Sequence, residues 1–456
     1  MNKLKVGFAR TDITPPLGIQ VDGYAIVRIA DGVLDPLEIN AIAMGSGETT
    51  VLFESFDVSG IGMETVAVIK KEISKRTGLD PKAIIISATH THTGPMLTTS
   101  AAELNDDDKV IIEKHLDFVI SKAVSAAVMA LDDMKDAKMG WRVGTAPNVA
   151  FVRRFRMKDG YVRTNPGVAN PDILEPIGKI DEKVSVIRFD REGAESIAFI
   201  NFANHPDVIG GCKISADWPG LARRVVERSI PNVKCIFVNG AEGDINHVNV
   251  KAKDGDMNDL ENDFDDVLRG YGHAQHIANV VAGAVMQVYS KVNYTDVNCV
   301  KYIEKTISVA TNKPKPEELP LARKYMQLHT DGRDDEIPFK AMELTTVVAE
   351  ARRMLRLENG PDSVDMTMTG VTIGDVAFIT IPGEGFNYIG RELKKCEDWS
   401  LTVPCGLSNG YQGYFPTQEA YDEGGYETRS SVFKAGVAEL FVEEGLKILK
   451  ELKTEK

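Results

Sequence analysis

Short apolar runs alternate with longer amphipathic segments along the chain. The apolar runs that matter most are AIIIS (83–87), SIAFINF (196–202), KCIFV (234–238) and VAFITI (376–381). They are rich in β-branched and aromatic residues at successive positions, which predicts strands buried on both faces. Residues 63–78 and 111–131 have apolar residues at helical spacing, which predicts helices. The pattern therefore predicts an α/β fold, with a layered mixed sheet covered by helices.

The length of 456 residues permits one large domain or two of ordinary size. No Gly/Ser-rich or Pro-rich linker and no internal repeat divides the chain. We therefore predict a single domain over residues 1–456. The acidic stretch NVKAKDGDMNDLENDFDD (249–266) is the best candidate for an internal boundary, and we predict that it forms a long loop or lid near the site.

Composition and charge exclude several classes of protein. With 43% hydrophobic and 26% charged residues, the chain can bury a large core and is not disordered. No apolar run approaches the roughly 18 residues of a membrane span, and the N-terminal segment has no long apolar secretory region, which predicts a cytoplasmic protein. Acidic residues outnumber basic ones, 67 to 53, which disfavours nucleic acid as a partner. We expect a small-molecule substrate.

The five cysteines do not suggest a framework of disulfides or a thiolate metal site. Their number is odd, they are widely spaced, and no CxxC pair occurs. We expect reduced, buried thiols.

Candidate chemistry follows the four apolar runs. They lead into ATHTHTGP, ANHPD, NGAEGDINH and PGEGFNY. In open α/β sheets, ligands bind beyond the carboxyl ends of the strands, so these loops are expected to converge on one site. Of the eight histidines, the loops carry His90, His92, His205 and His247.

Several of these residues suit a metal site, although each has a structural alternative. His90 and His92 have strand period two, so one could bind a metal while the other moves protons, or both could be hydrogen-bonded at a strand end. His205 is either a ligand or a satisfied core histidine. Glu384 precedes a predicted helix, where it either caps the helix or completes a His2Glu zinc site. Periodicity alone leaves these alternatives open.

Two further groups are weaker candidates. His273 and His276 have i,i+3 spacing but lack a neighbouring carboxylate. Arg153, Arg154 and Arg156 precede a turn, where they either decorate a solvated hairpin edge or anchor a substrate carboxylate or phosphate.

The loops also support a resemblance to a known family. In order, the chain contains VGFARTDITPP, ATHTHTGP, NFANHP with ISADWPG, GAEGDINH, PGEGF and NGYQGYFPTQEAYDEGGYE. In these segments it resembles the N-terminal catalytic domain of the neutral/alkaline, non-lysosomal ceramidases. The resemblance implies the fold of that domain and a Zn²⁺ site made by His90, His205, Glu384 and Tyr414. It also implies that His92 is catalytic, and Tyr414 could steady an oxyanion.

One residue departs from the family pattern. Asn246 stands where the family has a serine, and an amide cannot act as that nucleophile. A zinc-activated water remains available, with Asn246 as a hydrogen-bond donor and Arg153, Arg154 and His247 as substrate-binding residues. The chain also ends in a helix-like segment where family ceramidases continue into an immunoglobulin-like domain.

We therefore expect a zinc-dependent hydrolase that cleaves an amide or ester in a substrate more polar than ceramide. The alternatives are a metal-dependent isomerase or lyase and a non-catalytic metal-bearing binding protein.

Overall fold

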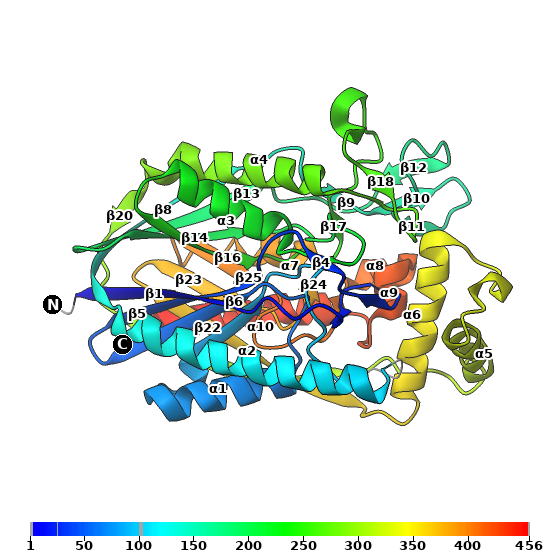
Figure 1. Cartoon of the computed structure of the whole chain (residues 1–456), viewed down its shortest axis with the longest axis horizontal. Helices are drawn as coiled ribbons and strands as arrows, with labels where there is room; N and C mark the ends of the chain where they lie inside the picture. Colours follow the sequence, from blue (N-terminus) through cyan, green and yellow to red (C-terminus); the bar gives the residue numbers. More distant parts are fainter. Residues whose placement is uncertain (1–2, 25, 100–103, 455–456) are drawn as a thin grey trace.

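Two stacked β-sheets form the centre of the protein (Figure 1). The computed structural model describes residues 3–24, 26–99 and 104–454. The larger sheet has the strand order β16 (Val233–Asn239), β14 (Ser196–Phe202), β13 (Lys183–Arg191), β8 (Lys135–Thr145), β1 (Leu4–Asp12), β5 (Glu38–Ser46), β6 (Thr49–Phe56), β7 (Ile84–Ala88), with β20 (Asn293–Thr295) paired to β8. The smaller sheet has the order β21 (Val300–Ala310), β22 (Ser363–Ile373), β23 (Val376–Thr380), β25 (Leu401–Cys405).

Both sheets are mixed. The pairs β14–β16, β6–β7 and β23–β25 are parallel, whereas neighbours such as β1–β5 and β21–β22 are antiparallel. Parallel strands need long crossovers, and here helices supply several of them. The predicted mixed sheet is thus confirmed.

The inner faces of the two sheets share one hydrophobic core. Phe53 and Phe199 of the larger sheet meet Phe378 of the smaller one, with ring centroids 5.2 Å apart in both pairs. All three rings are fully buried. This arrangement differs from the prediction that helices would cover both faces of one sheet. Apolar residues on both faces of a strand show that both faces are buried, but not whether a helix or another sheet covers them.

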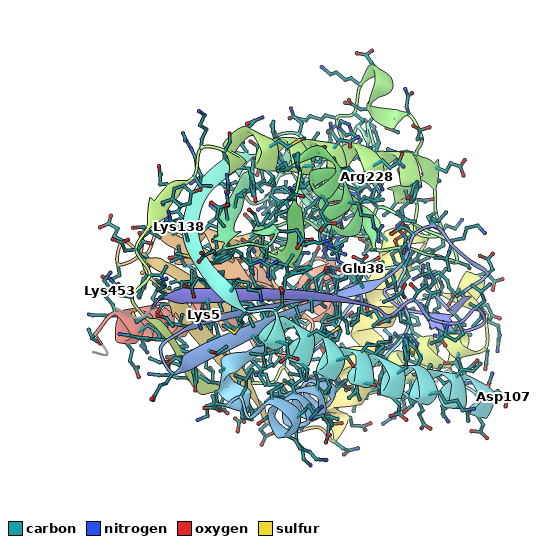
Figure 2. All side chains as sticks on the ribbon, turned by 60° about the vertical axis from the view of Figure 1, so that its left-hand side comes forward. Lys5, Glu38, Asp107, Lys138, Arg228 and Lys453 are labelled. Carbon is teal, nitrogen blue, oxygen red and sulfur yellow. The ribbon has the colours of Figure 1, made fainter. Side chains whose placement is uncertain are left out.

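Helices cover the two outer faces. Outside the larger sheet lie α1 (Met63–Thr77), α2 (Asp106–Asp132), α3 (Asp217–Ser229) and α4 (Tyr271–Tyr289), and outside the smaller one lie α7 (Asn387–Leu393) and α10 (Val437–Thr454). Charged side chains on the outside of the molecule include Asp107 on α2, Lys138 on β8 and Lys453 on α10, which are exposed (Figure 2). The result is four layers, with a helix layer on each side of the stacked sheets.

The two predicted helices are confirmed as α1 and α2. Gly78 ends α1 at φ 78°, in the left-handed region that glycine adopts without strain. Asn105 begins α2 with a reciprocal capping box to Asp108. Among the helices of the described residues, none is long and apolar enough to cross a membrane.

Several shorter elements lie at the end of the sheets where the strand-end loops meet. There, α5 (Leu319–Thr330) and α6 (Ala341–Glu358) pack together beside α9 (Tyr426–Ser430) (Figure 1). The other elements are β2 (Gln20–Val21), β3 (Arg28–Ile29), β4 (Gly32–Val33), η1 (Pro81–Ala83), β9 (Phe151–Val152), β10 (Arg154–Met157), β11 (Val162–Thr164), β12 (Ile173–Pro176), β15 (Lys213–Ile214), β17 (Ile245–Asn246), η2 (Asp254–Met257), β18 (Glu261–Asn262), β19 (Leu268–Arg269), η3 (Asp334–Glu336), β24 (Glu384–Gly385), β26 (Tyr414–Phe415) and α8 (Gln418–Glu423). The acidic stretch 249–266, predicted as a loop, contains η2 and β18.

Truncating the central aromatic contact tests the importance of the inner core. We expect Phe378→Ala to lower the free energy of unfolding by about 3–5 kcal/mol, because it removes a fully buried ring between the sheets and leaves a cavity. Denaturant unfolding followed by circular dichroism measures this change. The exposed Phe339→Ala is the matched control, for which we expect a much smaller effect. Equal losses in the two variants would contradict the assignment of this core.

Candidate metal centre and active site

The loops beyond several parallel strands converge at one end of the two sheets. His90 follows β7, His205 follows β14, and Glu242 follows β16 in the larger sheet, while Glu384 follows β23 in the smaller sheet. This is the convergence that the strand-end loops predicted, except that both sheets contribute. Tyr411 and Tyr414 follow β25 and line the same cavity.

Side-chain amides hold these loops together. The Nδ2 of Asn239, at the end of β16, donates to the backbone carbonyls of Thr89 (3.2 Å) and Asn204 (3.1 Å), which lie just before His90 and His205. The Nδ2 of Asn387 donates to the carbonyl of Ala241 at 2.9 Å. Since each bond joins different strand-end loops, the candidate ligands are supported by the rigid sheets behind them.

Four side chains could hold a metal ion. One ligand atom from each of His90, His205, Glu242 and Glu384 lies within 4.8 Å of the others, and all four residues are buried. The Nε2 of His90 is 3.1 Å from the Nε2 of His205 and 3.4 Å from the Oε2 of Glu384. Two ligands on one tetrahedral zinc stand roughly 3.3 Å apart, so this spacing fits a shared ion.

His92 belongs to the same cluster and offers an alternative triad. Its Nε2 is 3.3 Å from the Nε2 of His90, and His90, His92 and His205 also satisfy the distance limit for a shared ion. Its exposed fraction of 8% exceeds the 3% of His90 and the 1% of His205.

The hydrogen-bonding state of the cluster suits a cation. The Nδ1 of His90 contacts the backbone carbonyl of Ser59, an acceptor, so Nδ1 carries a proton and Nε2 is the ring nitrogen left to bind a cation. The Oε1 of Glu384 accepts from the Tyr411 hydroxyl at 2.8 Å. The Oε2 of Glu384 and both carboxyl oxygens of Glu242 have no hydrogen-bond partner among the described residues. Buried carboxylate oxygens without partners are costly, and a bound cation would remove that cost.

Protonation follows burial and charge in this cluster. Burial lowers the pKa of His92 and of His205 well below the usual value, so both imidazoles are neutral near pH 7. Burial acts in the same direction on His90, but Glu384, Glu242 and the carbonyl of Ser59 together outweigh it and raise the pKa of His90 to about 9. Burial raises the pKa of Glu242 to about 8. A metal would therefore displace protons from His90 and Glu242 when it binds.

Tyr414 is placed beside the cluster by a strand pairing. β24 and β26 pair in parallel with Glu384 opposite Tyr414, and the Tyr414 ring lies 5.6 Å from the Tyr426 ring. Burial raises the pKa of Tyr414 well above its usual value. The hydroxyl that hydrogen-bonds to Glu384 is that of Tyr411. The role of Tyr414 as a fourth ligand stays a prediction.

Arg153 and Arg154 are buried, with exposed fractions of 4% and 3%. The Nε of Arg153 donates to Glu427 at 2.7 Å and its Nη2 to the carbonyl of Gly243 at 2.7 Å. The Nη2 of Arg154 donates to the carbonyl of Gly424 at 2.8 Å. Arg154 also begins β10, the central strand of a three-stranded sheet. The alternative of a solvated hairpin edge is therefore wrong for both arginines, and their role as a substrate anchor stays a prediction.

Asn246 and His247 make contacts with neighbouring loops. The Nδ2 of Asn246 donates to the Oδ1 of Asn165 at 3.1 Å. The Nδ1 of His247 is 3.1 Å from the Oδ1 of Asp207, and the ring lines a separate 560 Å³ cavity with His273. In the described part of the chain, the lining of the cavity at His90 includes neither Asn246 nor His247. The roles of Asn246 and His247 stay predictions.

The residues that sequence reasoning missed are Glu242 and Tyr411. Glu242 stands in GAEGDINH, one of the four predicted site loops. The apolar strand just before this loop is the sequence feature that could have identified Glu242 as a site residue. Gly243 also lets this loop touch the next one, because a Cβ there would lie 2.4 Å from the carbonyl oxygen of Glu384.

A cavity of 340 Å³ opens over the cluster. His90, His92 and Glu384 line it together with Tyr411 and Tyr414. Further lining comes from residues 22–24, Ser59, Gln412, Gly413, Tyr426, Ser430, Val432 and one face of α6. The volume suits a small molecule.

Comparisons with known proteins support the fold described above. No family model matches the chain. Neutral ceramidase B of Dictyostelium discoideum is 23% identical over 428 aligned residues, which cover 77% of this chain and 58% of the relative. The chain thus spans less than two thirds of that protein.

Solved structures show the same fold over nearly the whole chain. Neutral ceramidase from Pseudomonas aeruginosa superposes with a TM-score of 0.72 at 15% identity, covering 99% of this chain and 75% of that one. A ceramidase complexed with C2 gives 0.69 at 14% identity, covering 99% and 76%. The resemblance found in the loop motifs is confirmed, and the chain is a ceramidase-like protein with the fold of the neutral ceramidases.

Proposed function

We propose that the protein is a zinc-dependent hydrolase that cleaves an amide or ester bond in a small substrate more polar than ceramide. The observation that carries the proposal is the buried cluster of His90, His205, Glu242 and Glu384 at the base of the 340 Å³ cavity. Nitrogen and carboxylate ligands of this kind suit zinc. The likeness to neutral ceramidase supports hydrolysis of an acyl bond.

The chain itself would supply the ligands and the proton transfer. When bound, zinc acidifies a water molecule and polarises a carbonyl group. His205 and Glu384 would hold the ion with His90, and Tyr414 stands beside them as the fourth ligand or as a hydrogen-bond donor to a developing oxyanion. His92 lines the cavity, and its Nδ1 has no hydrogen-bond partner among the described residues. We assign it the transfer of a proton from water to the leaving group.

Asn246 argues against ceramide as the substrate. The amide cannot act as the nucleophile in place of the serine that the resemblance places at this position. Its Nδ2 already donates a hydrogen bond to Asn165. Its own predicted role, hydrogen bonding to substrate or intermediate, belongs to the same proposal, as do the substrate contacts of Arg153, Arg154 and His247. A site lined by arginines and tyrosine hydroxyls suits a polar substrate better than two long acyl chains.

Metal analysis and a substrate screen test the proposal. We expect about one zinc per chain after purification, and chelation should abolish the activity while zinc restores it. Substrates should be screened by mass spectrometry, because hydrolysis adds water and releases a carboxylate whereas isomerisation conserves mass. We expect acyl amides with polar heads to be cleaved and ceramide to give little product. Binding without turnover would favour a binding protein, and strong release of fatty acid from ceramide would overturn the substrate assignment.

A further inference from the structure

One face of α6 forms a wall of the cavity over the metal cluster. The cavity-lining residues of this helix are Thr345, Val348, Ala349, Arg352, Arg353 and Arg356. Positions three and four apart lie on the same side of a helix, so these residues form a single stripe. Figure 1 shows α6 standing beside α9, at the loop end of the sheets. The stripe begins with the short side chains of Thr345, Val348 and Ala349 and carries three guanidinium groups towards its C-terminal end.

The arginines of this stripe present donors to the cavity. Arg353 has an exposed fraction of only 7%, and its Nη1 donates to the carbonyl of Asn312 at 2.8 Å. Its Nε is buried without a hydrogen-bond partner among the described residues. Arg352 and Arg356 are exposed side chains one helical turn apart. A buried N–H donor without a partner, at a cavity wall with two further guanidinium groups, is a feature that a bound anion would satisfy.

The acidic residues of α6 are paired with other cations. The Oε2 of Glu350 accepts from the Nε and Nη2 of Arg429 at 3.0 and 2.5 Å. Glu358 accepts from Arg323 at 2.5 Å, and Glu343 lies 3.8 Å from the Nε of Arg163. Among the described residues, the carboxylates that line the cavity are Asp22, which accepts from the Ser59 hydroxyl, and Glu384 of the metal cluster. Each acidic residue of α6 thus lies against an arginine outside the stripe.

We propose that Arg352, Arg353 and Arg356 form an anion-binding subsite, so that the substrate carries a carboxylate or phosphate group in addition to its scissile acyl bond. The planar guanidinium fork matches both of these groups. The apolar stretch at Val348 and Ala349 would contact a short acyl or alkyl portion. This inference rests on the proposed hydrolase function and adds the substrate class, an anionic acyl amide or ester.

Binding measurements with matched probes test the subsite. Hexanoylglycine and its neutral amide, hexanoylglycinamide, differ only in the anionic group, and the pair hexanoyl-O-phosphoethanolamine and hexanoylethanolamine tests phosphate. We expect the metal-loaded protein to bind one of the anionic probes about tenfold more tightly than its neutral partner in calorimetry. In the variant Arg352→Gln/Arg356→Gln we expect that preference to be lost.

The control variant is Arg228→Gln/Arg333→Gln, which removes the same charge from α3 and from the segment after α5. Both control residues are exposed, and neither lines this cavity. We expect this variant to keep the preference for the anionic probe, and thermal unfolding should show that both variants are folded. Equal binding of anionic and neutral probes, no binding of any probe at millimolar concentration, or a preference that survives Arg352→Gln/Arg356→Gln would overturn the subsite.

Turnover of the same probes separates this inference from the proposed function. Anion-dependent binding without release of hexanoate would uphold the subsite and count against hydrolysis. Equal cleavage of neutral and anionic probes would uphold hydrolysis and overturn the subsite. Cleavage of the carboxylate probe over the phosphate probe, or the reverse, identifies which anion the arginines recognise.

Discussion

His90→Ala is expected to lose bound metal and activity together. The Nε2 of His90 lies 3.1 Å from His205, 3.3 Å from His92 and 3.4 Å from Glu384. Its removal opens both of the possible metal-binding groups, since His90 belongs to each of them. Changing a residue that hydrogen-bonds to a metal ligand lowers metal affinity by roughly ten- to a hundredfold. We expect a larger loss of metal affinity here, because His90 would be a ligand itself.

Metal content after dialysis, measured by mass spectrometry, gives the first readout, and hydrolysis at saturating zinc gives the second. His329→Ala is the matched control, because His329 lies on α5 and hydrogen-bonds to Asp334 at 2.9 Å, outside the cavity. We expect this control to retain metal and activity. A His90→Ala protein that keeps stoichiometric metal would show that the cluster does not hold it.

The sequence predicted the region of the site because its signal is local. His90, His205 and Glu384 each follow an apolar strand within a few residues, and the ends of parallel strands meet at one edge of a sheet. What the sequence did not predict is that Glu384 comes from a second sheet stacked on the first. An apolar strand has the same pattern against a sheet as against a helix.

Residues whose roles depend on distant partners were harder to predict. Arg153 and Arg154 precede a turn, which favours exposure, but Glu427 pairs with Arg153 from 274 positions away along the chain. Buried arginines of this kind become visible only when the partner is known. Glu242 was missed for a different reason. It follows an apolar strand as closely as the predicted ligands do, but the family resemblance assigns a role to position 246 in this loop and none to position 242.

His92→Ala is expected to keep the metal while lowering turnover by about a hundredfold or more, the usual loss when a general acid or base is removed. Three features of His92 separate it from His90 and His205. It has the largest exposed fraction of the three, at 8%. Its Nδ1 has no hydrogen-bond partner among the described residues, so one ring nitrogen remains available for a proton. Its ring packs edge-on against Tyr24 at 4.9 Å, which fixes its orientation at the cavity wall.

The competing possibility is the triad of His90, His92 and His205, whose ligand atoms are also close enough to share an ion. Metal analysis separates the two roles. A proton carrier can be removed without loss of metal, whereas removal of a ligand opens the coordination shell. His92→Gln adds a second test, since glutamine retains a polar side chain but cannot carry the proton at neutral pH. We expect both His92 variants to bind zinc as the unmodified protein does and to share the low turnover. If His92→Ala lost its metal while Glu384→Ala retained it, His92 would be the ligand and another residue would have to move the proton.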